Sequence, residues 1–121
     1  MKVFLVDPHS IYRRGLVACL EGVPEIESVT DAAAVEAAWA SSGLLEADVV
    51  LVDHDLEDAH DFIRDLRERT DASVLVCSGR SDQRELLAAI QAGAVGYLWK
   101  ETLTPDALVA SLRTAVTGAP R

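Results

Sequence analysis

Four polar side chains end short apolar runs of the chain, and their types suit phosphoryl transfer. These residues are Asp7, Asp53, Ser78 and Lys100. A carboxylate can act as the nucleophile that accepts a phosphoryl group. An ammonium and a hydroxyl can bind the oxygens of that group, and a divalent cation held by carboxylates can neutralise them. The pattern indicates a phosphoryl-transfer pocket, provided that the fold brings the four residues together.

Asp53 follows the most apolar of these runs. Residues 49–52 are all valine or leucine, as in a strand that is buried on both faces of a parallel sheet. Ligands of open α/β sheets bind at the carboxyl edge of the strands, where Asp53 would lie. Taken alone, Asp53 has a simpler alternative role, because an aspartate after a strand often caps the next helix.

Strand-like and helix-like segments alternate five times along the chain. We predict strands at residues 2–6, 26–29, 48–52, 73–77 and 95–99, and helices at about 10–21 and 32–41, around 62–66, from 83 to Gly93, and from Pro105 onward. This alternation predicts an α/β fold, a flavodoxin-like (βα)5 doubly wound parallel sheet with strand order 2-1-3-4-5. In that order Asp7 and Asp53 lie on neighbouring strands, flanked by Ser78 and Lys100. The predicted helix N-caps are Asp31, Asp82 and Thr104.

The composition describes one acidic globular domain. The chain has 121 residues, half of them hydrophobic, a net charge of −9 and a pI of about 4.6. Such a charge argues against direct nucleic-acid binding by this domain, because the protein would repel phosphates. Cys19 and Cys77 lie in apolar stretches without metal-ligand spacing, so we expect buried free thiols in a reducing compartment. With no signal-peptide pattern and no apolar run of membrane-spanning length, we expect a cytoplasmic protein without membrane contact.

Four blocks at the strand ends resemble the receiver domain of two-component response regulators. They are residues 3–9 (VFLVDPH), 48–53 (DVVLVD), 74–79 (VLVCSG) and 93–100 (GAVGYLWK), in the order and spacing of that family. Residues 12–16 (YRRGL) and 96–98 (GYL) are similar to the NarL/FixJ subgroup, whose members usually carry a C-terminal helix-turn-helix domain. The resemblance covers nearly the whole chain, with residues 1–117 as the receiver domain and 118–121 as a tail or the start of a linker to a DNA-binding domain outside this chain.

The resemblance implies a role for each strand-end residue. Asp53 is implied as the phosphoacceptor, Ser78 as the hydroxyl that follows the phosphoryl group, and Lys100 as its counter-ion. Tyr97 is implied as the switch aromatic that is coupled to Ser78. Asp7, Asp53 and Asp55, the last through its backbone carbonyl, are the implied ligands of Mg²⁺. The implied partners are a sensor histidine kinase, a second copy of the chain, and DNA through the C-terminal domain.

Two departures from the family pattern weaken the expected metal site. Pro8 stands where the family usually has a second acid, so one Mg²⁺ ligand is missing. Asp7 could instead cap the first helix, with Pro8 at its first helical position. The loop after Asp53 brings five acids within nine residues, which would repel an anionic phosphodonor. The outer acids of that loop could equally form a solvated loop, and the side chain of Asp55 could serve as a substitute ligand.

Two interpretations of the function of this domain therefore remain open. The first is an atypical receiver that dimerises or binds a partner or small ligand without phosphorylation, and the second is a conventional Mg²⁺-dependent receiver phosphorylated on Asp53. We do not expect an enzyme, because a hydrolase that used Asp53 would need an acid/base, and none is evident. The dimer face is predicted on the first and last helices, with Val109 exposed, or on the fourth helix, fifth strand and last helix. His9, His54 and His60 could also join the acids in a transition-metal site.

Overall fold

Five parallel strands form the centre of the molecule. The computed structural model describes residues 1–79 and 82–118. The strands are β1 (Lys2–Val6), β2 (Ser28–Ala32), β3 (Val49–Asp53), β4 (Ser73–Ser78) and β5 (Gly96–Trp99), and they pair in the order β2-β1-β3-β4-β5. The predicted flavodoxin-like sheet and its strand order are therefore confirmed.

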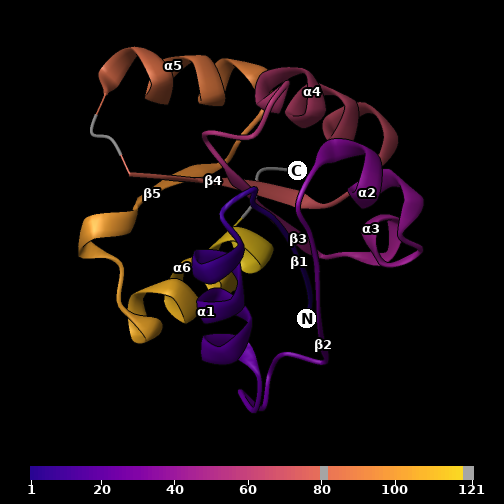
Figure 1. The fold of residues 1–121 in the computed structure, drawn as a ribbon, viewed down its shortest axis with the longest axis vertical. Helices are drawn as coiled ribbons and strands as arrows, with labels where there is room; N and C mark the ends of the chain where they lie inside the picture. The colour runs from indigo at the N-terminus through magenta and orange to yellow at the C-terminus, as the bar shows by residue number, and fades with distance from the viewer. Residues whose placement is uncertain (80–81, 119–121) are drawn as a thin grey trace.

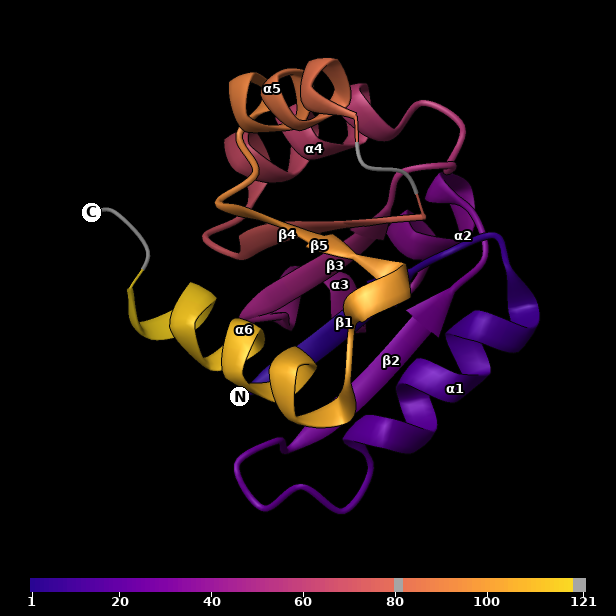
Figure 2. The same ribbon diagram turned by 90° about the vertical axis from the view of Figure 1, so that its left-hand side faces the viewer.

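Helices cover both faces of this sheet. In Figure 1 and Figure 2, α1 (Ser10–Leu20) and α6 (Pro105–Thr117) lie on one side of the sheet, whereas α4 (Ala59–Arg69) and α5 (Gln83–Ala92) lie on the other. The second side also carries α2 (Val35–Ala40) and the single turn α3 (Gly43–Glu46), and a 3₁₀ turn, η1 (Lys100–Thr102), follows β5. Within the described part of the chain, none of these helices has the length and apolar character needed to span a membrane.

The core consists of two apolar layers, one on each face of the sheet. Alternate side chains of a strand point to opposite faces. Phe4 and Val50 accordingly pack in the layer under α2 to α5, whereas Leu5 and Leu51 pack in the layer under α1 and α6. All five residues of β3 are buried, as the unbroken apolar run predicts. This double-sided burial holds the strand end that carries Asp53 in a fixed position.

The second strand and the helix after it differ from the prediction. β2 is Ser28–Ala32 rather than residues 26–29, and Asp31 lies within it, opposite Leu5 of β1. Asp31 is not a helix cap, because the N-cap of α2 is Ala34, and its carboxylate instead accepts a hydrogen bond from Arg13 Nε at 2.7 Å. The helix starts later, at Val35, and Gly43 begins the turn α3 instead of ending the helix. Asp31 is thus part of the sheet instead of the start of a helix.

The predicted ends of the last two long helices are confirmed. Asp82 Oδ1 accepts from Arg84 N at 2.9 Å, and Thr104 Oγ1 accepts from Ala107 N at 3.1 Å, with Pro105 as the first helical residue. Gly93 ends α5 with a φ of +125°, a conformation that favours glycine. These ends are decided by bonds within three residues, so the sequence alone predicts them.

The predicted solvent exposure of two side chains is wrong, and the prediction for the C-terminal tail falls mostly on residues that the structure does not describe. Cys19 is exposed, because it lies on the outer face of α1, whereas Cys77 is buried as expected. Val109 is half-buried and packs against the apolar layer under α6, so it is not an exposed interface residue. Of the predicted tail at residues 118–121, residues 119–121 lie outside the described residues.

Candidate functional site at the carboxyl edge of the sheet

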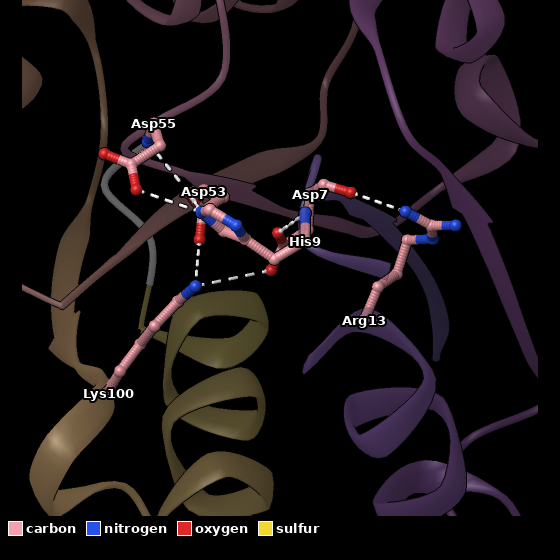
Figure 3. Close-up of polar contacts among 6 residues, drawn as sticks. All are labelled: Asp7, His9, Arg13, Asp53, Asp55 and Lys100. Carbon is pink, nitrogen blue, oxygen red and sulfur yellow. Dashed lines mark hydrogen bonds and ion pairs between the residues drawn. The ribbon is translucent and has the colours of Figure 1, made fainter. Parts of the chain in front are cut away.

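The carboxyl edge of the sheet brings the predicted side chains together. Val6 of β1 pairs with Val52 of β3, so Asp7 and Asp53 leave neighbouring strands side by side. Ser78 ends β4, the next strand, and Lys100 begins η1 directly after β5. Figure 3 shows the side chain of Lys100 reaching toward both carboxylates. We call Asp7, Asp53 and Lys100 the acidic site.

Lys100 forms ion pairs with both buried carboxylates. Its Nζ lies 2.5 Å from Asp53 Oδ2 and 3.6 Å from Asp7 Oδ2, and the two aspartates are each only 2% exposed. The ammonium also lies 4.1 Å from the ring centroid of Tyr12, where the ring face favours a cation. Burial lowers the pKa of Lys100, but the hydrogen bond to Asp53 and the two negative charges outweigh it, so the pKa is raised. Lys100 is therefore a fixed positive charge.

The carboxylate of each aspartate also accepts a hydrogen bond from the backbone N–H of the residue two positions later in the chain. Asp7 Oδ1 accepts from His9 N at 2.7 Å, and Asp53 Oδ1 accepts from Asp55 N at 2.8 Å. Neither aspartate caps a helix, because the N-cap positions of α1 and α4 are His9 and Asp58. The predicted cap by Asp7, with Pro8 at the first helical position, is therefore wrong. These bonds instead hold one oxygen of each carboxylate and direct the other toward Lys100.

The charge state of Asp7 is set mainly by its burial. Burial raises the pKa of Asp7, and the neighbouring negative charge of Asp53 raises it further. The backbone N–H of His9 and the charge of Lys100 lower it, but the net pKa is above its usual value. Two carboxylates that share one lysine leave a net negative charge in a buried place, which favours a further cation.

His9 lies beside the acids, as one alternative from the sequence had it, and Arg13, which sequence reasoning did not assign to the site, also belongs to this region. His9 Nε2 lies 3.0 Å from Asp55 Oδ2 and 3.7 Å from Asp53 Oδ1. Arg13 Nη1 donates to the main-chain oxygen of Asp7 at 2.7 Å, while its Nε binds Asp31. The signal was proximity in sequence, since His9 is two residues after Asp7 and Arg13 is in the first turns of the helix that follows. His54 and His60 do not join them, because both lie beside Glu85 instead.

The acidic site fits a small divalent cation through two carboxylates. Ligand atoms of Asp7, His9 and Asp53 all lie within 4.8 Å of one another. Within the described residues, Asp53 Oδ2 is paired with Lys100 Nζ, whereas the buried Asp7 Oδ2 lies 3.6 Å from that ammonium and accepts no hydrogen bond. Mg²⁺ binds proteins through one or two carboxylates and keeps several waters, so these residues can hold it. Pro8 adds no side-chain oxygen to this set.

The proposed switch residues lie beside the acidic site. Ser78 is buried at the end of β4, and Tyr97 is half-buried on the adjacent strand β5. Burial raises the pKa of Tyr97, and the hydroxyl of Ser78 opposes this rise. The ring of Tyr97 packs against that of Trp99, with centroids 4.9 Å apart. Cys77 is buried in the same strand as Ser78, and burial raises its pKa to about 11.

The fold and the site define a doubly wound α/β domain with two carboxylates and a lysine where the strand order reverses. The chain belongs to the response regulator receiver domain family, whose model matches residues 3–113. It is similar to the DNA-binding transcriptional activator DevR/DosR of Mycobacterium tuberculosis, with 38% identity over 84% of this chain and 48% of that protein. It is also similar to the transcriptional regulatory protein LiaR of Bacillus subtilis, with 30% identity over 100% of this chain and 58% of that protein.

A solved structure agrees with this assignment. A two-component response regulator of the LuxR family from Aurantimonas sp. SI85-9A1 superimposes with a TM-score of 0.84 and 28% identity, over 97% of this chain and 85% of that one. The chain spans about half the length of the curated relatives that it matches.

Proposed function

We propose that this chain is the receiver domain of a transcriptional response regulator, with Asp53 as the phosphoacceptor position. The observation that carries the proposal is the contact between Lys100 Nζ and Asp53 Oδ2 at 2.5 Å, in a site where Asp53 is buried at the end of a fully buried strand. A nucleophilic carboxylate next to a fixed ammonium is the pair that phosphoryl transfer to an aspartate needs.

Each residue of the site would have a separate role in phosphoryl transfer to Asp53. An oxygen of Asp53 attacks the phosphorus of an acyl phosphate, a P–O bond forms, and the bond to the leaving carboxylate breaks with its electron pair. Lys100 stabilises the negative charge on the transferred oxygens, and the hydroxyl of Ser78 donates to one of them. Asp7, Asp53 and the backbone carbonyl of Asp55 would hold Mg²⁺. When it is bound, Mg²⁺ supplies further neutralisation of the phosphoryl charge.

We propose further that this receiver is atypical. Pro8 leaves Asp7 as the single side-chain acid at the end of β1, so Mg²⁺ binding is weakened. His9 Nε2 contacts Asp55 Oδ2 and lies 3.7 Å from Asp53 Oδ1, so an imidazole lies next to the phosphoacceptor position. Lys100 already compensates part of the buried negative charge. These features support a signalling and dimerisation module whose output does not require phosphorylation.

The alternative is a conventional receiver that a sensor histidine kinase phosphorylates on Asp53 with Mg²⁺. The observation that favours it is the complete set of phosphate-handling residues, since Asp53, Ser78 and Lys100 all end neighbouring strands at one edge. The buried Oδ2 of Asp7, which accepts no hydrogen bond within the described residues, also offers a place for the cation.

The mass of the intact protein after incubation with acetyl phosphate separates the two candidates. The chain and its Asp53→Asn variant are incubated with and without Mg²⁺. The atypical receiver predicts no phosphoryl gain at millimolar Mg²⁺ in a folded protein. A Mg²⁺-dependent gain of one phosphoryl group that Asp53→Asn abolishes would establish the conventional receiver and overturn the atypical one.

The relatives suggest the wider setting of this domain. The protein DevR/DosR is described as DNA-binding, and LiaR as a transcriptional regulatory protein. By analogy we propose that DNA contacts of the whole protein lie in a C-terminal domain outside this chain. The net charge of −9 supports this division, because a negatively charged receiver is poorly suited to bind DNA itself.

A second copy of the chain is the proposed partner of the α1–α6 groove. This apolar depression of about 300 Å³ is lined by residues of α1, of the segment before α6 and of α6 itself, among them Ile11, Gly15, Cys19, Leu103 and Leu108. Ile11 is 88% exposed at its rim. A large aliphatic side chain beside an apolar groove is self-complementary, which is what a two-fold interface requires. The alternative face includes the exposed Leu87 and Ile90 of α5.

A further inference from the structure

An imidazole lies within reach of a metal ion that both buried carboxylates of the acidic site would bind. Ligand atoms of Asp7, His9 and Asp53 all lie within 4.8 Å of one another. Figure 3 shows the imidazole of His9 reaching from its backbone beside Asp7 toward Asp53 and Asp55. We call Asp7, His9 and Asp53 the imidazole–carboxylate set.

The backbone of His9 is held in place from both sides. Its N–H donates to Asp7 Oδ1 at 2.7 Å, and its carbonyl oxygen accepts from Arg13 N at 2.9 Å at the start of α1. Pro8 has a fixed φ and restricts the backbone of the residue before it, so the segment between Asp7 and His9 has little freedom. The imidazole is therefore carried by a well-anchored backbone, as a preorganised ligand requires.

The distance between His9 and Asp53 suits two ligands of one metal ion. Ligand atoms that each lie about 2.0–2.2 Å from a tetrahedral zinc ion are about 3.3–3.6 Å apart. His9 Nε2 lies 3.7 Å from Asp53 Oδ1, which is too long for a hydrogen bond but close to this separation. Asp53 Oδ1 accepts a hydrogen bond from Asp55 N, and a carboxylate oxygen with one such bond retains a lone pair for a metal ion.

The buried carboxylate of Asp7 independently points to a cation at this place. Asp7 is only 2% exposed, and within the described residues its Oδ2 accepts no hydrogen bond. Lys100 Nζ lies 3.6 Å from this oxygen, but the closer partner of that ammonium is Asp53 Oδ2. Burying a carboxylate oxygen without a hydrogen bond is unfavourable, and a metal ion would relieve that cost.

The types of the three ligands decide which ion they suit. Mg²⁺ requires near-octahedral coordination by oxygen, whereas imidazole is a ligand of zinc and of other transition metals. Because Pro8 has no side-chain oxygen, the third protein ligand within reach is the nitrogen of His9. Three protein ligands and one open position for water form the tetrahedral arrangement of non-structural zinc sites. The imidazole–carboxylate set therefore suits Zn²⁺ better than Mg²⁺.

We infer that the acidic site binds Zn²⁺ in preference to Mg²⁺, with His9 as a direct ligand beside Asp7 and Asp53. The side chain of Asp55, whose Oδ2 lies 3.0 Å from His9 Nε2, is 53% exposed and turns toward solvent when the metal takes that nitrogen. The inference rests on the proposed function only in placing a cation between Asp7 and Asp53. It does not depend on phosphorylation of Asp53.

Calorimetric titrations of Zn²⁺ and of Mg²⁺ into the chain test the inference. The test variant is His9→Asn, and the matched control is His60→Asn, which removes a histidine that lies beside Glu85 instead. Asp7→Asn checks that the ions bind at the acidic site. The side chains of His9 and His60 are 48% and 36% exposed, so both variants should fold, which circular dichroism verifies. NMR of the imidazole nitrogens reports directly whether His9 Nε2 binds the metal.

The expected result is one Zn²⁺ per chain, bound more tightly than Mg²⁺, with a shift of the His9 Nε2 resonance. Loss of an outer-shell partner of a metal ligand costs about 10–100-fold in affinity, so loss of His9 as a direct ligand should weaken Zn²⁺ binding at least about tenfold. The Mg²⁺ affinity of His9→Asn should not change, because Mg²⁺ prefers oxygen ligands. Asp7→Asn should weaken the binding of both ions, and His60→Asn of neither.

The inference would be overturned by the absence of Zn²⁺ binding, by an unshifted His9 resonance, or by a loss of Zn²⁺ affinity in His9→Asn below about tenfold. An equal loss of both ions in His9→Asn, an equal loss of Zn²⁺ affinity in His60→Asn, or unchanged binding in Asp7→Asn would overturn it as well. None of these results would decide the proposed function, because the gain of a phosphoryl group at Asp53 is measured separately with Mg²⁺.

Discussion

Replacing Lys100 by methionine should destabilise the domain strongly, because it leaves two buried carboxylates without their counter-ion. The ammonium lies 2.5 Å from Asp53 Oδ2, a separation at which the attraction is about 6–7 kcal/mol for an effective dielectric constant of about 20. The cost of desolvating the charges offsets part of this gain, and removing one partner of a buried pair typically costs about 3–5 kcal/mol. Lys100 is 16% exposed, so screening by water is limited.

A double-mutant cycle isolates the pair from the rest of the site. In the Asp53→Asn background, Lys100→Met no longer breaks the close charge pair and removes only the contacts with Asp7 and the Tyr12 ring, so its cost should fall by about 2–3 kcal/mol. A domain of 121 residues has a free energy of unfolding of about 6–18 kcal/mol, which leaves the single variants folded.

Urea denaturation of the four proteins at pH 7, with a chelator to exclude divalent cations, provides the free energies. The reasoning would be refuted by additive effects, with the two single-variant costs summing to the double-variant cost within about 0.5 kcal/mol. Additivity would mean that Lys100 is solvated and does not compensate Asp53. A coupling near zero would also remove the main support for Asp53 as the position where phosphoryl charge is stabilised.

Three further predictions follow from the same geometry. Pro8→Asp should restore a metal ligand and tighten Mg²⁺ binding by at least about tenfold in a calorimetric titration, and unchanged affinity would show that Pro8 does not limit the site. Ile11→Glu should shift the chain toward monomer in analytical ultracentrifugation, with Leu87→Glu as the control on the other face, and the opposite outcome would move the interface to α5. Asp7→Asn should stabilise the metal-free domain at pH 7, because burial raises the pKa of Asp7 and the stability of the parent is therefore lost as the pH rises through that raised value. Since the neutral forms of the two side chains are similar, the advantage of Asp7→Asn in urea midpoints should shrink as the pH falls toward the usual aspartate pKa, and an advantage that grows in acid would contradict the assignment.

The sequence by itself determined the features that depend on neighbouring residues. The apolar runs of β1, β3 and β4, the cap of α6 by Thr104 and the glycine that ends α5 were all predicted from local patterns. The strand order followed from general rules for alternating strands and helices. Because parallel strands end at one edge, the grouping of Asp7, Asp53, Ser78 and Lys100 could be predicted without coordinates.

The tertiary structure alone decided which side chains meet across the chain. Asp31 lies in β2 and accepts a hydrogen bond from Arg13 of α1 instead of capping a helix. Cys19 is exposed because it lies on the outward face of α1. From the sequence, His54 and His60 could have joined the acids in a metal site, but in the fold both lie beside Glu85 of α5. A single helix cap is worth only about 1 kcal/mol, so the pairing of whole strands can override it. Contacts between distant segments depend on the relative positions of whole elements, and no pattern within a single segment encodes them.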